Sequence, residues 1–147
     1  MPDSGRVLRV AALRLLTRRD HSRAELKAKL ATTAESPEQL DAVLDVLQAE
    51  RLLSDHRFAT QRVVARAGRY GDARLKQELR QQGVSDEDIT AALPEAGDEA
   101  ARCRAVWARK FRLPPQSVEE RAKQMRFLQY RGFSSEVIRR VMRGVDE

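Results

Sequence analysis

The spacing of apolar residues along the chain predicts helices almost throughout. Leu40, Val43, Leu44 and Leu47 recur at intervals of three and four residues, which places them on one face of a helix. No segment alternates apolar and polar residues as a half-buried strand does, and there is no Asn-Gly or Asp-Gly hairpin signal. Helices are expected near residues 6–18, 23–32, 37–51, 55–68, 73–82, 86–93, 98–110, 118–131 and 135–143.

Capping residues mark where these helices begin and end. A serine at the N-cap is followed three positions later by a side chain that can accept a hydrogen bond. Such pairs occur at Ser22 and Glu25, Ser36 and Gln39, Ser85 and Asp88, and Ser117 and Glu120. Gly83 and Gly132, each followed by an apolar residue and a serine, are expected in the left-handed conformation just after a helix. His21 precedes the Ser22 cap and is expected to pack structurally against Leu26.

The same signals recur at a spacing of 49 residues, one third of the 147-residue chain. Leu79, Gly83, Ser85 and Ile89 superpose on Leu128, Gly132, Ser134 and Ile138. Such a period is typical of one supersecondary unit stacked on itself. The sequence therefore predicts an all-α fold of three tandem three-helix repeats, resembling helix-turn-helix units, in an elongated, curved array. The expected units span residues 1–54, 55–97 and 98–147.

The net charge of +6 is distributed unevenly over this period. Residues 1–49 hold 8 basic and 7 acidic residues, residues 50–98 hold 8 and 9, and residues 99–147 hold 12 and 6. The whole excess thus belongs to the basic last third. Such an asymmetry favours a polyanionic or acidic partner there, although a solvated basic face that aids solubility is the alternative.

Residues for catalysis or for binding a cofactor or metal do not stand out. The sequence has no G-x-G-x-x-G and no phosphate-binding loop, and His21, His56 and Cys103 lack metal-ligand spacing. The acidic run Asp86–Asp88 suits the positive end of a helix dipole better than a metal. We expect a non-enzymatic protein without cofactor or metal, and an inert Cys103. With no signal peptide and no apolar segment long enough to cross a bilayer, the expected location is the cytoplasm, with no membrane partner.

Basic residues at helical spacing are the remaining candidates for function. Arg62, Arg66 and Arg69 follow the spacing of one helix face, and Lys123 and Arg126 form a stripe with Tyr130. Guanidinium groups suit bidentate contact with phosphates or carboxylates, although a single arginine can simply pair with a nearby acid, as Arg74 can with Glu78. The candidate partner-binding or DNA-binding residues are Arg62, Arg66, Arg69, Arg74, Lys76, Arg80, Lys123, Arg126, Arg131, Arg139, Arg140 and Arg143.

Several stretches of the chain resemble a known bacterial family. They are residues 12–30, Asp55–Ala59 running to Arg69–Gly71, Leu75–Ser85, and Arg126–Ser134 with Ile138. In order and spacing they resemble the RecX family, regulators of the RecA recombinase, over roughly residues 8–143. The resemblance implies three three-helix units, in agreement with the 49-residue period.

The resemblance also implies a function. Proteins of this family lie in the deep groove of the RecA filament on single-stranded DNA, where they inhibit strand exchange, ATP hydrolysis and co-protease activity. We therefore expect two partners, the RecA filament and single-stranded DNA, with weak binding to bare DNA. A monomer is expected, because both ends of the chain are polar.

Two other functions fit the same residues. The first is an autonomous helix-turn-helix DNA-binding protein, whose tight glycine turn and basic third unit this chain shares. Against it, the best candidate for a helix that reads base edges, 73–82, must give Leu75 and Leu79 to the core. The second is an adaptor that recognises an acidic protein and never touches DNA.

Overall fold

The structure is a computed structural model and describes residues 3–144, which are helical with no strand. The α-helices are α1 (Ser4–Arg18), α2 (Arg23–Leu30), α3 (Pro37–Ala49), α4 (Asp55–Arg66), α5 (Asp72–Gln81), α6 (Asp86–Ala92), α7 (Glu99–Lys110), α8 (Val118–Tyr130) and α9 (Ser135–Arg143), and a short 3-10 helix, η1 (Leu93–Ala96), follows α6. The predicted all-α class is confirmed. Every predicted helix has its counterpart, while η1, which contains Pro94, was not predicted.

The predicted capping signals are present where the helices begin and end. The Ser22 hydroxyl accepts from the Glu25 backbone N–H at 3.1 Å, and the Glu25 carboxylate accepts from the Ser22 N–H at 3.0 Å, which completes a capping box. The hydroxyls of Ser36, Ser85 and Ser117 likewise accept from a backbone N–H three residues later. Gly83 and Gly132 have φ angles of +81° and +94°, the left-handed conformation that ends α5 and α8.

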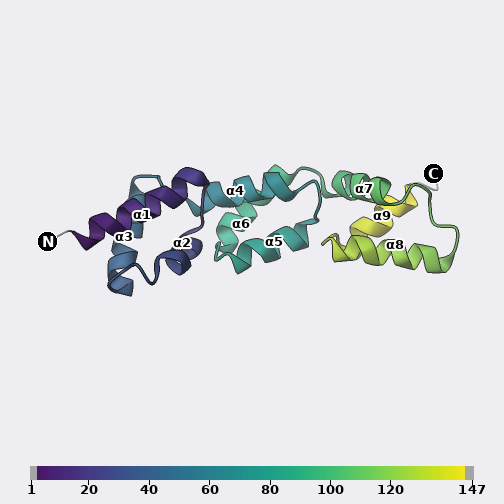
Figure 1. Ribbon diagram of the computed structural model, residues 1–147. Helices are drawn as coiled ribbons and strands as arrows, with labels where there is room; N and C mark the ends of the chain where they lie inside the picture. Colours follow the sequence, from purple (N-terminus) through teal and green to yellow (C-terminus); the bar gives the residue numbers. More distant parts are fainter. Residues whose placement is uncertain (1–2, 145–147) are drawn as a thin grey trace.

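Three separate hydrophobic cores lie one after another along the molecule. We call α1–α3 unit one, α4–α6 with η1 unit two, and α7–α9 unit three; they form an elongated row (Figure 1). The cores include Leu8, Leu26 and Leu44 in unit one, Phe58, Leu79 and Ile89 in unit two, and Trp107, Leu128 and Ile138 in unit three. Burying one such side chain contributes about 1.5–3 kcal/mol, so each triplet of helices is held by its own core.

The two junctions between units share one arrangement. At the first junction, the Ser22 hydroxyl donates to the Gln82 carbonyl oxygen at 2.7 Å. At the second, 49 residues later on both sides, the Gly71 N–H donates to the Arg131 carbonyl oxygen at 2.8 Å. At both junctions the end of one unit's second helix therefore meets the start of the preceding unit's second helix, so the sequence period is repeated in three dimensions.

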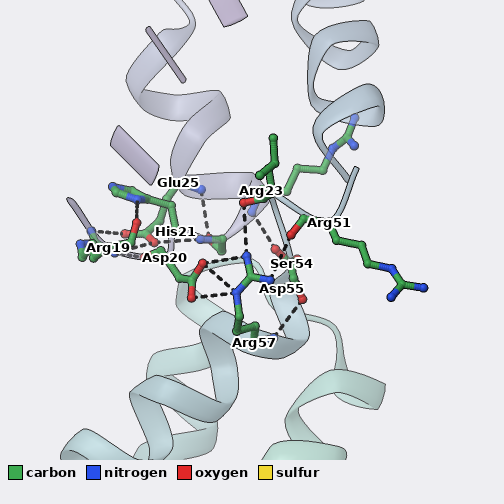
Figure 2. A network of polar contacts seen from close by, with 11 residues as sticks. Arg19, Asp20, His21, Arg23, Glu25, Arg51, Ser54, Asp55 and Arg57 are labelled. Atoms are coloured by element: carbon green, nitrogen blue, oxygen red, sulfur yellow. Dashed lines mark hydrogen bonds and ion pairs between the residues drawn. The ribbon is translucent and has the colours of Figure 1, made fainter. Parts of the chain in front are cut away.

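An arginine near the start of α4 and of α7 also ties each unit to the one before it. The Nε of Arg57 donates to both carboxylate oxygens of Asp20, at 3.0 and 2.9 Å, and its Nη1 donates to the Arg51 carbonyl oxygen (Figure 2). At the second junction Arg102 donates to the Asp72 carboxylate at 2.8 Å and to backbone carbonyls of unit two. Charge-assisted bonds of this kind are about twice as strong as neutral ones, so they fix the relative position of neighbouring units.

Candidate nucleic-acid interface

A groove lies where the end of α8 meets the start of α5, at the junction of units two and three. It consists of two neighbouring hollows of about 590 and 430 Å³, both lined by Tyr70, Phe127 and Arg131. We call it the junction groove. Its lining residues are Arg69, Tyr70, Arg74, Val106, Arg109, Lys110, Lys123, Arg126, Phe127, Tyr130 and Arg131, and none of them is acidic.

Tyr70 forms the inner wall of the groove and is surrounded by guanidinium groups. Arg74, Arg66 and Arg131 lie 4.4, 4.7 and 5.5 Å from the centre of its ring. Glu78 forms ion pairs with two of these cations: its carboxylate lies 2.7 Å from Arg66 and 3.7 Å from Arg74. The hydrogen bond to Glu78 raises the pKa of Arg66. Arg66 and Arg74 are therefore held by Glu78, whereas Arg131 forms no ion pair within the described residues.

The outer part of the groove carries exposed cations. They are Arg69, Arg109, Lys110, Lys123 and Arg126, and none of them forms an ion pair within residues 3–144. Arg109 is fixed by donating to the Gly68 carbonyl oxygen at 2.6 Å, and Lys110 lies 5.5 Å from the Phe127 ring. Several unneutralised cations in one concave surface raise the local concentration of a polyanion.

Aromatic rings are interleaved with these cations. Phe127 packs edge-on against Phe111, with ring centroids 5.5 Å apart, and also lies 5.2 Å from the Arg131 guanidinium. Tyr130, about one turn further along α8, is 84% exposed. Positive charge that follows a backbone, together with exposed rings on which bases stack, is the combination used to bind single-stranded nucleic acids.

The structure brings together five of the twelve residues predicted from the sequence. Arg69, Arg74, Lys123, Arg126 and Arg131 line the junction groove. The others lie outside it: Arg62, Arg66, Lys76 and Arg80 in unit two, and Arg139, Arg140 and Arg143 on the exposed face of α9.

The expected single face of Arg62, Arg66 and Arg69 does not form. Helix α4 ends at Arg66, so Arg69 lies in the loop beyond it, and the Arg66 side chain is turned toward Glu78 on α5. Arg80 is likewise paired, with Asp86 at 3.1 Å. Pairing across neighbouring helices, which helical spacing does not register, explains the difference.

Sequence reasoning missed Tyr70, Arg109, Lys110 and Phe127 as groove residues. A signal for two of them was available in the repeat itself. The positions 49 residues before Arg109 and Lys110 hold Thr60 and Gln61. A comparison between units therefore shows two neutral residues replaced by cations.

The remaining candidate chemistry is limited. Among residues 3–144, no group of three or more His, Cys, Asp or Glu residues is placed to hold a metal ion. Cys103 is buried in the third core, and burial, with a smaller contribution from Glu99, raises the pKa of its thiol to about 11. No helix among the described residues is long and apolar enough to cross a membrane.

Comparison with known proteins gives matches along nearly the whole chain. Family models described as the first, second and third three-helix domains of RecX match residues 9–47, 54–93 and 97–142. The regulatory protein RecX of Ralstonia pickettii is 47% identical over 143 residues, which cover 95% of this chain and 89% of the relative. The regulatory protein RecX of Ectopseudomonas mendocina is 44% identical, and the match covers all of both chains.

Solved structures of the same name share the fold. A crystal structure of regulatory protein RecX superposes with a TM-score of 0.82 at 25% identity, covering 99% of this chain and 74% of the other. The crystal structure of RecX from Lactobacillus salivarius gives a TM-score of 0.87 at 20% identity and covers 99% of each chain, which supports the fold alone. The relatives are named as regulatory proteins, which points to a non-enzymatic role. With three family domains matched in order and relatives above 40% identity over most of its length, the chain belongs to the RecX family of regulatory proteins.

Proposed function

We propose that this protein is a non-enzymatic regulator of homologous recombination and DNA repair that acts in the cytoplasm as a monomer. It binds the RecA filament on single-stranded DNA, in the filament groove, and inhibits the recombinase, ATPase and co-protease activities. The observation that carries the proposal is the junction groove, with its exposed cations and aromatic rings, in a chain of this family.

The shape of the molecule supports the same function. Three small units in a row present a long surface without needing one large core, and a long thin surface can contact several subunits of a helical filament. The exposed arginines Arg139, Arg140 and Arg143 add further cations on α9 of the same unit. Within this proposal unit one contributes mainly length and packing, since its basic and acidic residues nearly balance.

The alternative, an autonomous helix-turn-helix protein, has a specific difficulty. Leu75 and Leu79 on α5 are each only 2% exposed, so the best candidate for a recognition helix gives one face to the core of unit two. A further side of the same helix carries Glu78, which pairs with Arg66. Of the remaining basic residues on α5, Arg80 is itself paired with Asp86 at 3.1 Å, which leaves fewer free side chains to read bases in a major groove.

Charge reversal tests the proposal. The variant Arg139→Glu, Arg140→Glu, Arg143→Glu is compared with Arg6→Glu, Arg14→Glu, Arg18→Glu, which makes the same charge change in unit one. We expect the first variant to need at least about tenfold more protein to inhibit the DNA-dependent ATPase of the recombinase, since complementary charge promotes association. The unit-one variant is expected to inhibit almost as the wild type does.

Folding of both variants is checked by circular dichroism and thermal denaturation. If both folded proteins inhibit equally, the arginines of α9 are not where the recombinase filament binds. If the wild type does not inhibit at all, the proposed function is wrong. Binding to bare duplex DNA that exceeds binding to recombinase-coated single strands would instead support the autonomous DNA-binding protein.

A further inference from the structure

Tyr130 is the most exposed large apolar or aromatic side chain of the described chain. It lies at the last position of α8 and is 84% exposed. Phe127, three residues earlier, lies on the same side of the helix and is half-buried against Phe111. One ring of the groove is therefore fixed in the wall, while the next is left free at its rim.

Cations flank these two rings on the same helix. Lys123 and Arg126 line the 590 Å³ hollow together with Phe127 and Tyr130, and both are exposed. Neither forms an ion pair within the described residues, in contrast to Arg74 on the opposite wall, which lies 3.7 Å from Glu78. The hollow thus presents free positive charge beside a free aromatic face.

The first junction shows that the fold does not require this chemistry. Its contact between Ser22 and Gln82 repeats the one between Gly71 and Arg131. The positions that correspond to Arg126, Phe127, Tyr130 and Arg131 are Gln77, Glu78, Gln81 and Gln82. At these four positions the same scaffold therefore carries neutral and acidic side chains at one junction and cationic and aromatic ones at the other, whereas the position that matches Lys123 holds a cation, Arg74, at the first junction too.

We propose that the junction groove is a binding site for single-stranded nucleic acid, in which an unpaired base stacks on Tyr130 while Lys123 and Arg126 contact the adjacent phosphates. An acidic protein segment would pair with the cations but has no planar group to stack on the exposed Tyr130 ring. A duplex would satisfy the cations too, but its bases are already stacked on one another and offer no free face. The hollow, at about 590 Å³, lies within the range of sites that hold small ligands.

The base site deepens the proposed function and rests on it only for the biological role of the bound strand. Within a recombinase filament it would give the protein a direct contact with the DNA besides its contact with protein. The base site is tested without the recombinase, so one proposal can be disproved while the other holds.

The test compares two oligonucleotides that differ only in their bases. Fluorescence anisotropy at low salt measures binding of an oligothymidine of about 15 nucleotides and of an abasic chain with the same number of phosphates. We expect the wild type to prefer the oligothymidine by about 5- to 150-fold, the value of one base stacked on an aromatic ring. Tyr130→Ala should reduce binding of the oligothymidine to the abasic level, and Tyr130→Phe should keep the preference because its ring remains.

Two further variants serve as controls. Arg126→Ala should weaken binding of both chains equally and reduce the slope of log affinity against log salt concentration by about 0.7, as expected for one phosphate contact. Gln81→Ala, at the matching position of the first junction, should change neither. All variants are first shown to have the helical content and melting behaviour of the wild type.

Two outcomes would overturn the base site. The first is equal binding of the two chains by the wild type, and the second is a preference for bases that survives Tyr130→Ala. Parallel measurements of recombinase inhibition keep the proposals distinct. A protein that prefers bases but does not inhibit the recombinase would disprove the proposed function alone, and one that inhibits without any preference for bases would disprove the base site alone.

Discussion

Replacing Gly83 with alanine tests how closely units one and two are packed at their junction. Gly83 has φ +81°, and a Cβ atom there would lie 2.3 Å from the Cβ of Ala24 on α2. The next nearest atom, the Ala24 Cα, is 3.8 Å away, an ordinary contact. The obstruction is thus a single methyl group.

The expected loss of stability has two parts. An alanine in the left-handed conformation costs about 1–2 kcal/mol, partly offset by about 0.4–1 kcal/mol from the reduced entropy of the unfolded chain. The backbone conformation alone should therefore lower the free energy of unfolding of Gly83→Ala by about 1 kcal/mol. Gly83→Ala adds the cost of overpacking, about 1–3 kcal/mol, and should lower it by about 2–4 kcal/mol.

Urea denaturation followed by far-ultraviolet circular dichroism measures these losses, and a double-mutant cycle isolates the contact. Ala24→Gly removes the obstructing methyl group and by itself costs about 1 kcal/mol, because glycine is a poor helix former. In the double variant Gly83→Ala, Ala24→Gly the overpacking cost should disappear, which leaves a coupling of about 1–3 kcal/mol. A coupling near zero would show that the two units are not held in this close contact.

Two predictions concern titratable groups. His21 donates from Nδ1 to the Arg19 carbonyl oxygen and accepts at Nε2 from Lys29. Burial is the main cause that lowers the pKa of His21, and the Arg19 and Lys29 cations lower it further. The hydrogen bond to the Arg19 carbonyl oxygen and the charge of Glu25 oppose this shift but do not cancel it. The folded chain therefore takes up this proton less readily than the unfolded chain, so stability is complete above the unfolded pKa of about 6.5 and is lost as the pH falls from there toward the lower folded pKa. Denaturation at pH 7 and pH 5 should show a smaller pH dependence for His21→Gln than for the wild type, and equal dependence would contradict the assignment. For Cys103, a pKa raised from 9.0 to about 11 lowers the thiolate fraction at pH 8 by about 100-fold, so a thiol reagent should react far more slowly with the native protein than with the urea-unfolded one.

The helices could be predicted because their signals are local. Ser22 and Ser36 cap helices through residues three positions away, and Gly83 and Gly132 end them through their own backbone conformation. Such signals recur in each unit, so a weak signal in one unit is supported by its copies. The short η1 helix was missed because it belongs to unit two alone and does not repeat.

The junction groove could be predicted only in part, because it is assembled from segments far apart in sequence. Helical spacing identified Lys123 and Arg126, which share one helix with Tyr130. It could not place Arg109 in the same groove as Phe127 of that helix, since Arg109 comes from α7. Nor could helical spacing show that Glu78 on α5 pairs with Arg66 on α4. Such pairs distinguish the arginines that are neutralised within the protein from those that are free to bind a partner. The distinction depends on packing between helices, not on spacing within one.

Because the junction groove lies between two units, ligand binding there depends on how firmly those two units are held against each other. Arg69 belongs to unit two and Lys123 to unit three, so a ligand that contacts both binds the docked arrangement more tightly than a separated one. By linkage, the ligand stabilises the docked arrangement of the two units by the same free energy by which that arrangement strengthens ligand binding. The Gly71 contact with Arg131 and the ties made by Arg102 hold that arrangement before any ligand binds, which reduces the ordering cost of binding. The repeated junction therefore has the same backbone contacts at both copies, and the proposed binding site differs from the first junction in its side chains and not in its fold.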